Sequence, residues 1–128
     1  MNISNDTKIK LIDLESKVLD VVAAQLDAPE REILLEQFEH AIVRDRTMTG
    51  HGFYLTFIID SEVSKLPKQL QNIGNVSAEI SGLKHGAGFN LYIKDGIVDH
   101  LEGYCYEDQW PDPWPNSEPF EVKDMSRI

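Results

Sequence analysis

Apolar and polar residues alternate on both sides of Asp95-Gly96 in the second half of the chain. Residues 89–94 and 97–106 each show a period of two, which is typical of a strand with one buried face. Asp-Gly is favoured in the two-residue turns of hairpins, because both central positions have a positive φ there. The pattern therefore predicts a β-hairpin, and the rest of the fold can be built outward from it.

Three further segments alternate in the same way and extend the predicted sheet. They are residues 40–48, 53–59 and 75–82. In the first of them Ala41 and Val43 alternate with His40, Ile42, Arg44 and Arg46, which indicates a strand. Glycine-rich turns next to these segments favour antiparallel pairing of neighbouring strands.

The first 38 residues have a different period and predict two helices. Apolar residues at spacings of three and four form one stripe between Leu11 and Leu26. Asp27-Ala-Pro29 then starts a second helix, because Asp is a good cap and Pro suits the first helical turn. This helix is expected to end near Gln37.

The predicted fold class is α+β, with two N-terminal helices packed on one face of a five-stranded, mainly antiparallel sheet. Residues 1–128 are expected to form one domain, in which 1–38 are helical and 39–108 form the sheet. Residues 109–128 are expected to be an extended acidic tail rich in Trp and Pro, because four of the six prolines lie between 111 and 119. Within this tail, residues 120–122 could add a short edge strand.

The period of two also assigns the strand residues to the two faces of the sheet. The face under the helices receives Phe53, Leu55, Phe57, Val76, Ala78, Ile80, Phe89, Leu91, Ile93 and Leu101. The opposite face, which we call the open face, receives Tyr54, Thr56, Ser77, Glu79, Asn90, Tyr92, His100, Glu102, Tyr104 and Tyr106. All four tyrosines of the chain are therefore expected on the open face.

The charge of the chain favours a basic protein partner. The net charge is −10, and residues 95–128 contain nine acidic residues and two basic ones. Nucleic-acid binding is disfavoured, because its affinity comes mostly from neutralising phosphates. A basic protein would instead be attracted to the chain over long distances.

Cysteine content and hydropathy point to the cytoplasm. Cys105 is the single cysteine, which excludes an internal disulfide and fits a reducing compartment. No apolar stretch is long enough to span a bilayer, and the first residues do not resemble a signal peptide. We therefore expect a cytoplasmic protein with no membrane association.

Three segments of the chain resemble a group of small bacterial hypothetical proteins. They are Arg46-Thr-Met-Thr-Gly-His-Gly-Phe-Tyr, Gly86-Ala-Gly-Phe-Asn-Leu-Tyr-Ile-Lys-Asp-Gly and Leu101-Glu-Gly-Tyr-Cys-Tyr-Glu-Asp-Gln-Trp-Pro. The pattern covers about residues 40–111, and no activity is established for the group, so the resemblance implies no catalytic residue. In size, acidity and fold class these proteins are similar to immunity proteins of bacterial toxin systems, which implies a binding function.

His51 and His85 are candidates for a different kind of site. Both are expected in turns at one end of the sheet, where the strand ending at residue 106 would bring Glu107 and Asp108 close to them. Two imidazoles and a carboxylate could bind a divalent metal or transfer protons. No local metal-binding spacing supports this alternative. The neighbouring glycine pairs are explained by turn geometry, and no motif predicts a cofactor.

The leading hypothesis is a non-enzymatic binding protein that uses the aromatic and acidic open face. The candidate binding residues are Tyr54, Tyr92, Tyr104, Tyr106, Glu79, Glu102, His100, Trp110 and Trp114. The two tryptophans would either anchor the partner or fold the tail over the open face. The alternatives are a metal site or enzyme at the histidines, a small-ligand pocket between helices and sheet, and a homodimer.

Overall fold

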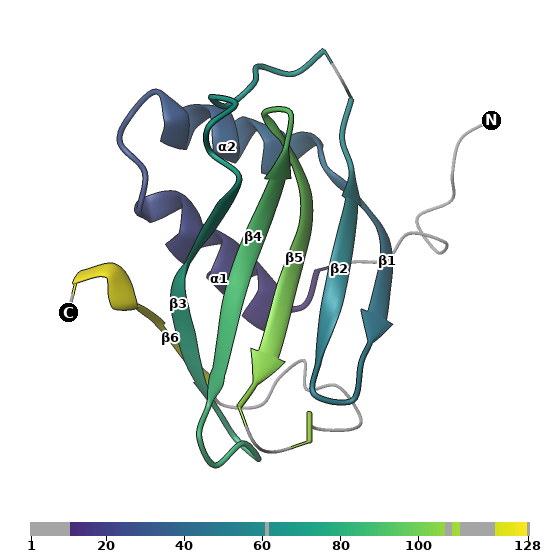
Figure 1. The fold of residues 1–128 in the computed structure, drawn as a ribbon, viewed down its shortest axis with the longest axis vertical. Helices are drawn as coiled ribbons and strands as arrows, with labels where there is room; N and C mark the ends of the chain where they lie inside the picture. The colour runs from purple at the N-terminus through teal and green to yellow at the C-terminus, as the bar shows by residue number, and fades with distance from the viewer. Residues whose placement is uncertain (1–10, 61, 107–108, 111–119, 128) are drawn as a thin grey trace.

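A computed structural model describes residues 11–60, 62–106, 109–110 and 120–127. They form two helices, a six-stranded sheet and a final 3₁₀ turn (Figure 1). The helices are α1 (Asp13–Ala24) and α2 (Glu30–His40). The strands are β1 (Ile42–Met48), β2 (Gly52–Ile58), β3 (Asn72–Ile80), β4 (Ala87–Lys94), β5 (Ile97–Cys105) and β6 (Phe120–Asp124), and the 3₁₀ turn is η2 (Met125–Arg127). The predicted α+β class is therefore correct.

All strand pairs in the sheet are antiparallel, in the order β1-β2-β5-β4-β3-β6. The β4–β5 hairpin lies at the centre, and its Asp95 and Gly96 have φ values of 53° and 80°. Both values are positive, as the predicted two-residue turn requires. The hairpin prediction is confirmed, and it places β5 between β4 and β2.

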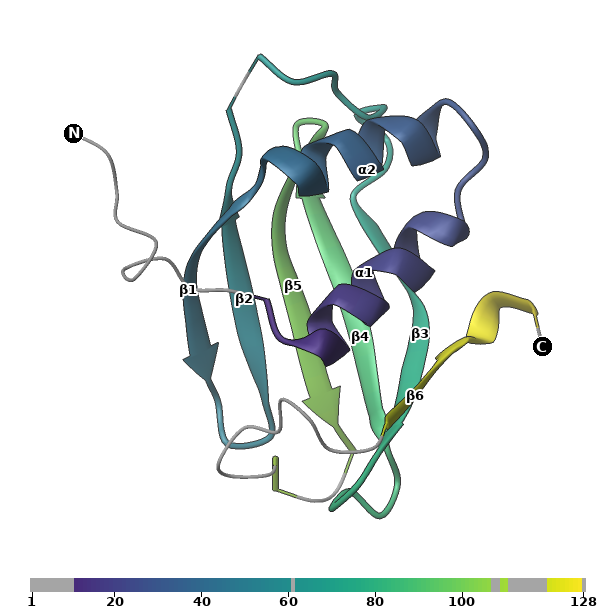
Figure 2. The same cartoon turned by 180° about the vertical axis from the view of Figure 1, so that it is seen from behind.

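Both helices lie on the same face of the sheet (Figure 2). The ten strand residues that we assigned to this face are all buried, with Leu55, Leu91 and Leu101 fully inaccessible. Val18 and Val22 of α1 and Leu34 of α2 complete the core, again with no exposed surface. No helix or strand of the described residues covers the open face, which is turned toward the viewer in Figure 1.

The prediction of five strands is wrong, because β6 adds a sixth at the edge of the sheet beside β3. Phe120 and Val122 are half-buried and pack against the core, while Glu121 and Lys123 alternate with them. We had noted that residues 120–122 could add a short edge strand, and β6 forms that strand by pairing with β3. Residues 120–127 are therefore not an extended tail, and 111–119 lie outside the described residues.

A β-bulge in β1 places Arg46 on the helix side of the sheet, where strict alternation from the buried Val43 would not place it. The register shifts between Val43 and Asp45, so that Arg46 lies opposite Leu55 and points toward the helices. Its guanidinium donates to both carboxylate oxygens of Glu15 in α1, with N···O distances of 2.6 and 2.8 Å. The Glu15 carboxylate also accepts the Ile12 backbone N–H at 3.0 Å, which caps the start of α1.

A buried glutamine fixes α2 to the central hairpin. The side-chain oxygen of Gln37 accepts the Val98 N–H, and its nitrogen donates to the carbonyl oxygens of Gly96 and Ser64, all within 2.8–2.9 Å. All of its hydrogen-bonding groups lie in the core, and these contacts satisfy both ends of the amide.

In the part of the chain that the structure describes, no helix is long and apolar enough to cross a membrane.

Candidate functional site

Cross-strand register groups the predicted face residues into rows across the open face. Tyr54, Glu102 and Asn90 form one row across β2, β5 and β4. Thr56, His100 and Tyr92 form the next row on the same three strands. Because directly opposed side chains lie about 5 Å apart, each row is a line of contacts. Tyr104 lies two residues beyond Glu102 on β5, opposite Gly52 and Gly88. The register therefore confirms that Tyr54, Tyr92 and Tyr104 share a face with His100 and Glu102.

His100 lies between two tyrosine rings. It stacks on Tyr92 with ring centroids 4.6 Å apart and planes 16° from parallel, and Tyr54 meets it edge-on at 5.7 Å. Its Nδ1 lies 2.6 Å from Asp99 Oδ2. Since a carboxylate only accepts hydrogen bonds, this contact places a proton on Nδ1 and fixes the orientation of the imidazole. His100 therefore pairs with its sequence neighbour Asp99.

The position of Asp99 depends on a second β-bulge. The register of β4 and β5 shifts between the pairs Tyr92–His100 and Ile93–Val98, so Asp99 has no partner on β4. A bulge directs successive side chains toward the same side of a sheet, which strict alternation forbids. Sequence reasoning missed Asp99 for this reason, and no residue in the stretch signals the bulge.

A chain of hydrogen bonds ends on Glu102. The Asn90 side-chain nitrogen donates to the Tyr92 hydroxyl at 3.3 Å, and this hydroxyl donates to Glu102 Oε1 at 3.2 Å. The other Asn90 atom, Oδ1, is buried and accepts no hydrogen bond within the described residues. Buried acceptors usually have partners, so the open face contains hydrogen-bonding capacity that the fold leaves unused.

Glu102 creates a negative region around the tyrosine hydroxyls. Its charge, followed by its hydrogen bonding, raises the pKa of Tyr54 above 10.0. Burial is the main reason for the raised pKa of Tyr92, and Glu102 is the second. Burial also raises the pKa of Tyr104, followed by the effects of Tyr106 and Glu102. All three hydroxyls therefore stay protonated at neutral pH and can donate hydrogen bonds.

Tyr104 and Tyr106 extend the aromatic surface toward the end of β5. Their rings meet edge-to-face at 5.7 Å, and Tyr106 is 59% exposed. The Tyr104 ring lies over Gly88 of β4, since a Cβ at Gly88 would come within 2.5 Å of it. Glycine at this position therefore lets a large ring lie flat on the sheet. At the opposite end of the face, Ile42 and Ile58 are paired and exposed, and we had not singled them out.

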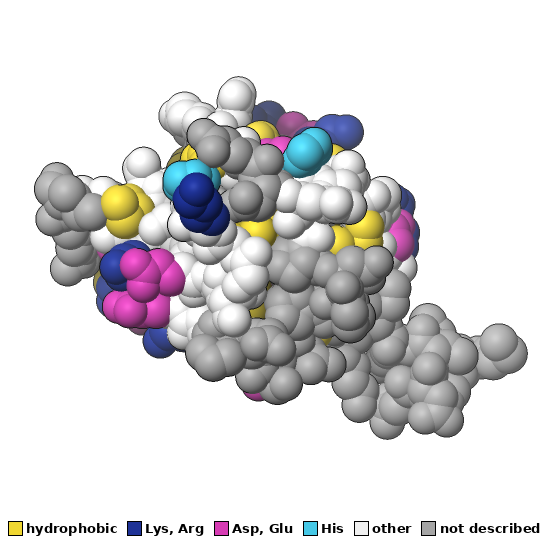
Figure 3. Space-filling model, turned by 90° about the horizontal axis from the view of Figure 1, so that it is seen from below, with side chains coloured by type: hydrophobic (Ala, Val, Ile, Leu, Met, Phe, Trp, Pro, Cys, Tyr) yellow, Lys and Arg dark blue, Asp and Glu magenta, His cyan; other side chains and the backbone are white. Residues whose placement is uncertain are grey.

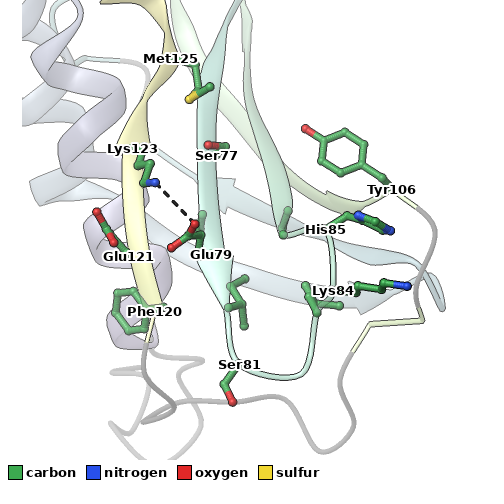
Figure 4. A pocket seen from close by; sticks show the side chains of 15 residues that line it. Ser77, Glu79, Ser81, Lys84, His85, Tyr106, Phe120, Glu121, Lys123 and Met125 are labelled. Atoms are coloured by element: carbon green, nitrogen blue, oxygen red, sulfur yellow. Dashed lines mark ion pairs between the residues drawn. The ribbon is translucent and has the colours of Figure 1, made fainter. Parts of the chain in front are cut away.

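Glu79 lies apart from this aromatic centre, on β3, where its carboxylate is 3.5 Å from Lys123 of β6. Together with Lys84, His85 and Tyr106 these two residues line an open groove of about 870 Å³ at the β3–β4 turn (Figure 4). The groove lies between β6, the turn and the end of β5, and not between the helices and the sheet, where a ligand pocket was expected.

Trp110 does not belong to the open face. It is buried in the core, with its ring 5.5 Å from Phe53, and its backbone N–H donates to the Gly50 carbonyl oxygen at 2.9 Å. The prediction that Trp110 lies on the binding face is therefore wrong, and it does not cover the tyrosines. The β1–β2 turn draws residue 110 to the helix side instead. Trp114 lies outside the described residues.

His51 and His85 both lie at the end of the molecule where the β1–β2 and β3–β4 turns are found (Figure 1). Viewed from this end, histidine side chains form two separate patches (Figure 3). Within the described ranges, no three His, Cys, Asp or Glu side chains are grouped closely enough to hold a metal ion. Glu107 and Asp108 lie outside these ranges, so a site that joins them to the two histidines stays a prediction.

Comparison with known proteins found no match to the chain. No protein-family model matches the chain, and no curated protein or solved structure matches it. The open face is therefore interpreted from its own geometry and charge.

Proposed function

We propose that the protein is a non-enzymatic binding module whose open face binds a basic region of another protein. The observation that carries this proposal is the cluster of Tyr54, Tyr92, His100 and Glu102 at the centre of a sheet face that no described helix or strand covers. Aromatic rings around a carboxylate present a large contact area and a negative charge in one place.

The exposed apolar residues support a protein partner. Tyr54, Tyr104, Tyr106, Ile42 and Ile58 are all more than a third exposed, and all belong to the open side of the sheet. Tyrosine is enriched among the residues that dominate binding energies. Large exposed apolar side chains on one side of a sheet are typical of an interaction site.

The charges on the same side support a basic partner. Arg44 pairs with Asp45 and Lys123 with Glu79, which leaves Glu102 as an acidic centre without a cation among the described residues. The net charge of −10 adds a long-range attraction for positive proteins. Association should therefore be fast at low ionic strength and slower in salt.

The resemblance to small bacterial proteins supports an immunity-like role within this proposal. An acidic protein of this size would bind a basic toxin domain in the cytoplasm and block its active surface. The single cysteine is consistent with that compartment.

The test begins with a pull-down from the native lysate and identification of the captured protein by mass spectrometry. The purified partner is then titrated against wild-type protein, against Tyr92→Ala with Tyr104→Ala, and against His51→Ala with His85→Ala. We expect the tyrosine pair to weaken binding by about tenfold or more, which corresponds to about 1.4 kcal/mol. The histidine pair should bind within about twofold of wild type.

Salt provides an independent measurement on the same complex. The association rate with the partner should fall as ionic strength rises, because attraction between separated charges is screened beyond about 10 Å at 0.1 M salt. If the histidine pair abolishes binding while the tyrosine pair leaves it intact, the open face is not the site, and the metal or enzyme alternative is favoured.

A further inference from the structure

Glu102 differs from other acidic side chains of the protein in the kind of group that contacts its carboxylate. It lies on β5 between Tyr54 of β2 and Asn90 of β4, and its Oε1 accepts the Tyr92 hydroxyl. A carboxylate offers about four lone-pair positions, and hydrogen bonds from the Tyr92 and Tyr54 hydroxyls leave some of them for another donor.

Among the described residues, cations accompany other acids of the protein but not this one. Glu15 pairs with Arg46, and Glu79 pairs with Lys123. No described Lys or Arg pairs with Glu102, although it is half-buried and surrounded by rings. A half-buried charge without a counter-ion costs free energy that a cation from another molecule would recover.

The surroundings of Glu102 also present an aromatic surface. Tyr54 is 40% exposed and lies directly across from Glu102 on β2. A ligand at Glu102 would thus meet an exposed aromatic ring and a carboxylate together.

We propose that Glu102 and Tyr54 form a binding site for one arginine side chain of the partner, with the guanidinium stacked on the Tyr54 ring and donating to the Glu102 carboxylate. This inference rests on the proposed function, and it specifies which side chain of the partner binds and where on the open face it binds. A guanidinium is planar and carries donors in a fork that matches a carboxylate, so it can stack and pair at once. The ammonium of lysine is compact and cannot make the same flat contact.

The experiment uses three blocked tripeptides as probes: acetyl-Gly-Arg-Gly-amide, its lysine analogue and its neutral norleucine analogue. Each is titrated to millimolar concentration into the full-length protein, and the ring resonances of Tyr54 and Tyr92 are followed by NMR. The variants are Glu102→Gln, which keeps the shape and the hydrogen bond to Tyr92, and Glu79→Gln as a control on the same face. Chemical denaturation of each variant confirms that it is folded.

We expect saturable shifts with the arginine probe, and binding weaker by about threefold or more with the lysine probe. The norleucine probe should cause no saturable shift, because it lacks the charge. Glu102→Gln should weaken arginine binding by about tenfold, while Glu79→Gln stays within about twofold of wild type. Absence of saturable shifts, equal binding of arginine and lysine, or an unchanged affinity in Glu102→Gln would each overturn the arginine site.

Titration of the purified partner against the variants distinguishes a failure of this inference from a failure of the proposed function. If Tyr92→Ala with Tyr104→Ala weakens partner binding but Glu102→Gln does not, the open face is the interface and the arginine anchor is wrong. If the arginine probe binds at Glu102 while the tyrosine variant still binds the partner fully, the site exists and the proposed function fails.

Discussion

The two faces of the sheet use alternate residues of the same strands, but they differ in how their polar groups are satisfied. On the helix face, Glu15 and Gln37 are fully buried, and each has hydrogen-bond partners from distant elements. On the open face, Asn90 Oδ1 is buried without a hydrogen-bond donor and Glu102 lacks a cation among the described residues. The polar groups of Glu15 and Gln37 are thus satisfied within the fold, whereas Asn90 and Glu102 can still accept hydrogen bonds, as the proposed binding surface requires.

Glycines show the same contrast in packing. Gly103 lies under the Phe53 ring in the core, where an added Cβ would come within 2.3 Å of a ring carbon. Gly88 lies under the Tyr104 ring on the open face, where the corresponding distance is 2.5 Å. Phe53 is held by Phe89 and Trp110 around it, whereas Tyr104 is 38% exposed and can move outward.

The largest expected difference between the faces concerns their acidic residues. Glu15→Ala should lower the free energy of unfolding by about 3–5 kcal/mol, because it removes the fully buried carboxylate to which the largely buried Arg46 guanidinium is paired. Glu79→Ala removes an exposed ion pair and should cost less than about 1 kcal/mol. Urea denaturation of both variants gives the comparison. Equal losses would mean that Glu79 contributes to the fold as Glu15 does.

Adjacent residues of β4 provide the second comparison. Leu91→Ala should cost about 2–5 kcal/mol, since it creates a cavity beneath the helices. Tyr92→Ala should cost about 1 kcal/mol, because it loses cross-strand contacts with His100 on a face that remains solvated. Guanidinium denaturation of both variants measures the two losses of stability. Two large and equal losses would show that both faces of β4 are buried in the folded protein.

The strand periodicity was sufficient to predict both faces of the central sheet. All ten residues assigned to the core face are buried, and the open-face rows contain the predicted tyrosines with His100 and Glu102. Alternation works here because each strand is buried on one side only, and a shift by one residue would expose the whole apolar set.

The errors arise where contacts between distant segments decide the structure. The bulges at Arg44 and Asp99 insert one residue into a strand, which turns Arg46 toward Glu15 and brings Asp99 beside His100. Trp110 follows no periodic pattern, and its burial depends on Phe53 and on the β1–β2 turn. None of these features leaves a local signal in the sequence, since each depends on the register between strands or on a core that forms elsewhere.

The two glycines give a third comparison with a smaller effect. Gly103→Ala should destabilise the protein by about 1–3 kcal/mol, because the new methyl group pushes against a ring that the core holds in place. Gly88→Ala should cost less, since the half-exposed Tyr104 ring can swing away. It should instead weaken binding of the partner, because Tyr104 is displaced from the open face. Thermal unfolding and partner titration together would show whether the two effects separate; a larger loss of stability in Gly88→Ala would contradict this account of the open face.

The smallest expected effect is a change in tyrosine ionisation, and it probes the field of Glu102 directly. Because the charge of Glu102 is the main cause of the raised pKa of Tyr54, Glu102→Gln should lower that pKa toward 10.0. The pKa of Tyr104 should change less, because burial is its main cause and Glu102 ranks behind Tyr106. Ring resonances followed by NMR between neutral and alkaline pH resolve the individual tyrosines.

The same linkage predicts how stability responds to alkaline pH. A tyrosine with a raised pKa in the folded protein favours folding below its unfolded value of 10.0, and this contribution is lost as the pH rises through the folded value. Wild-type protein should therefore lose stability more steeply than Glu102→Gln between neutral and strongly alkaline pH. Identical alkaline profiles, with an unchanged Tyr54 titration, would show that Glu102 does not act on the tyrosine hydroxyls, and the negative centre on which a cationic anchor depends would be absent.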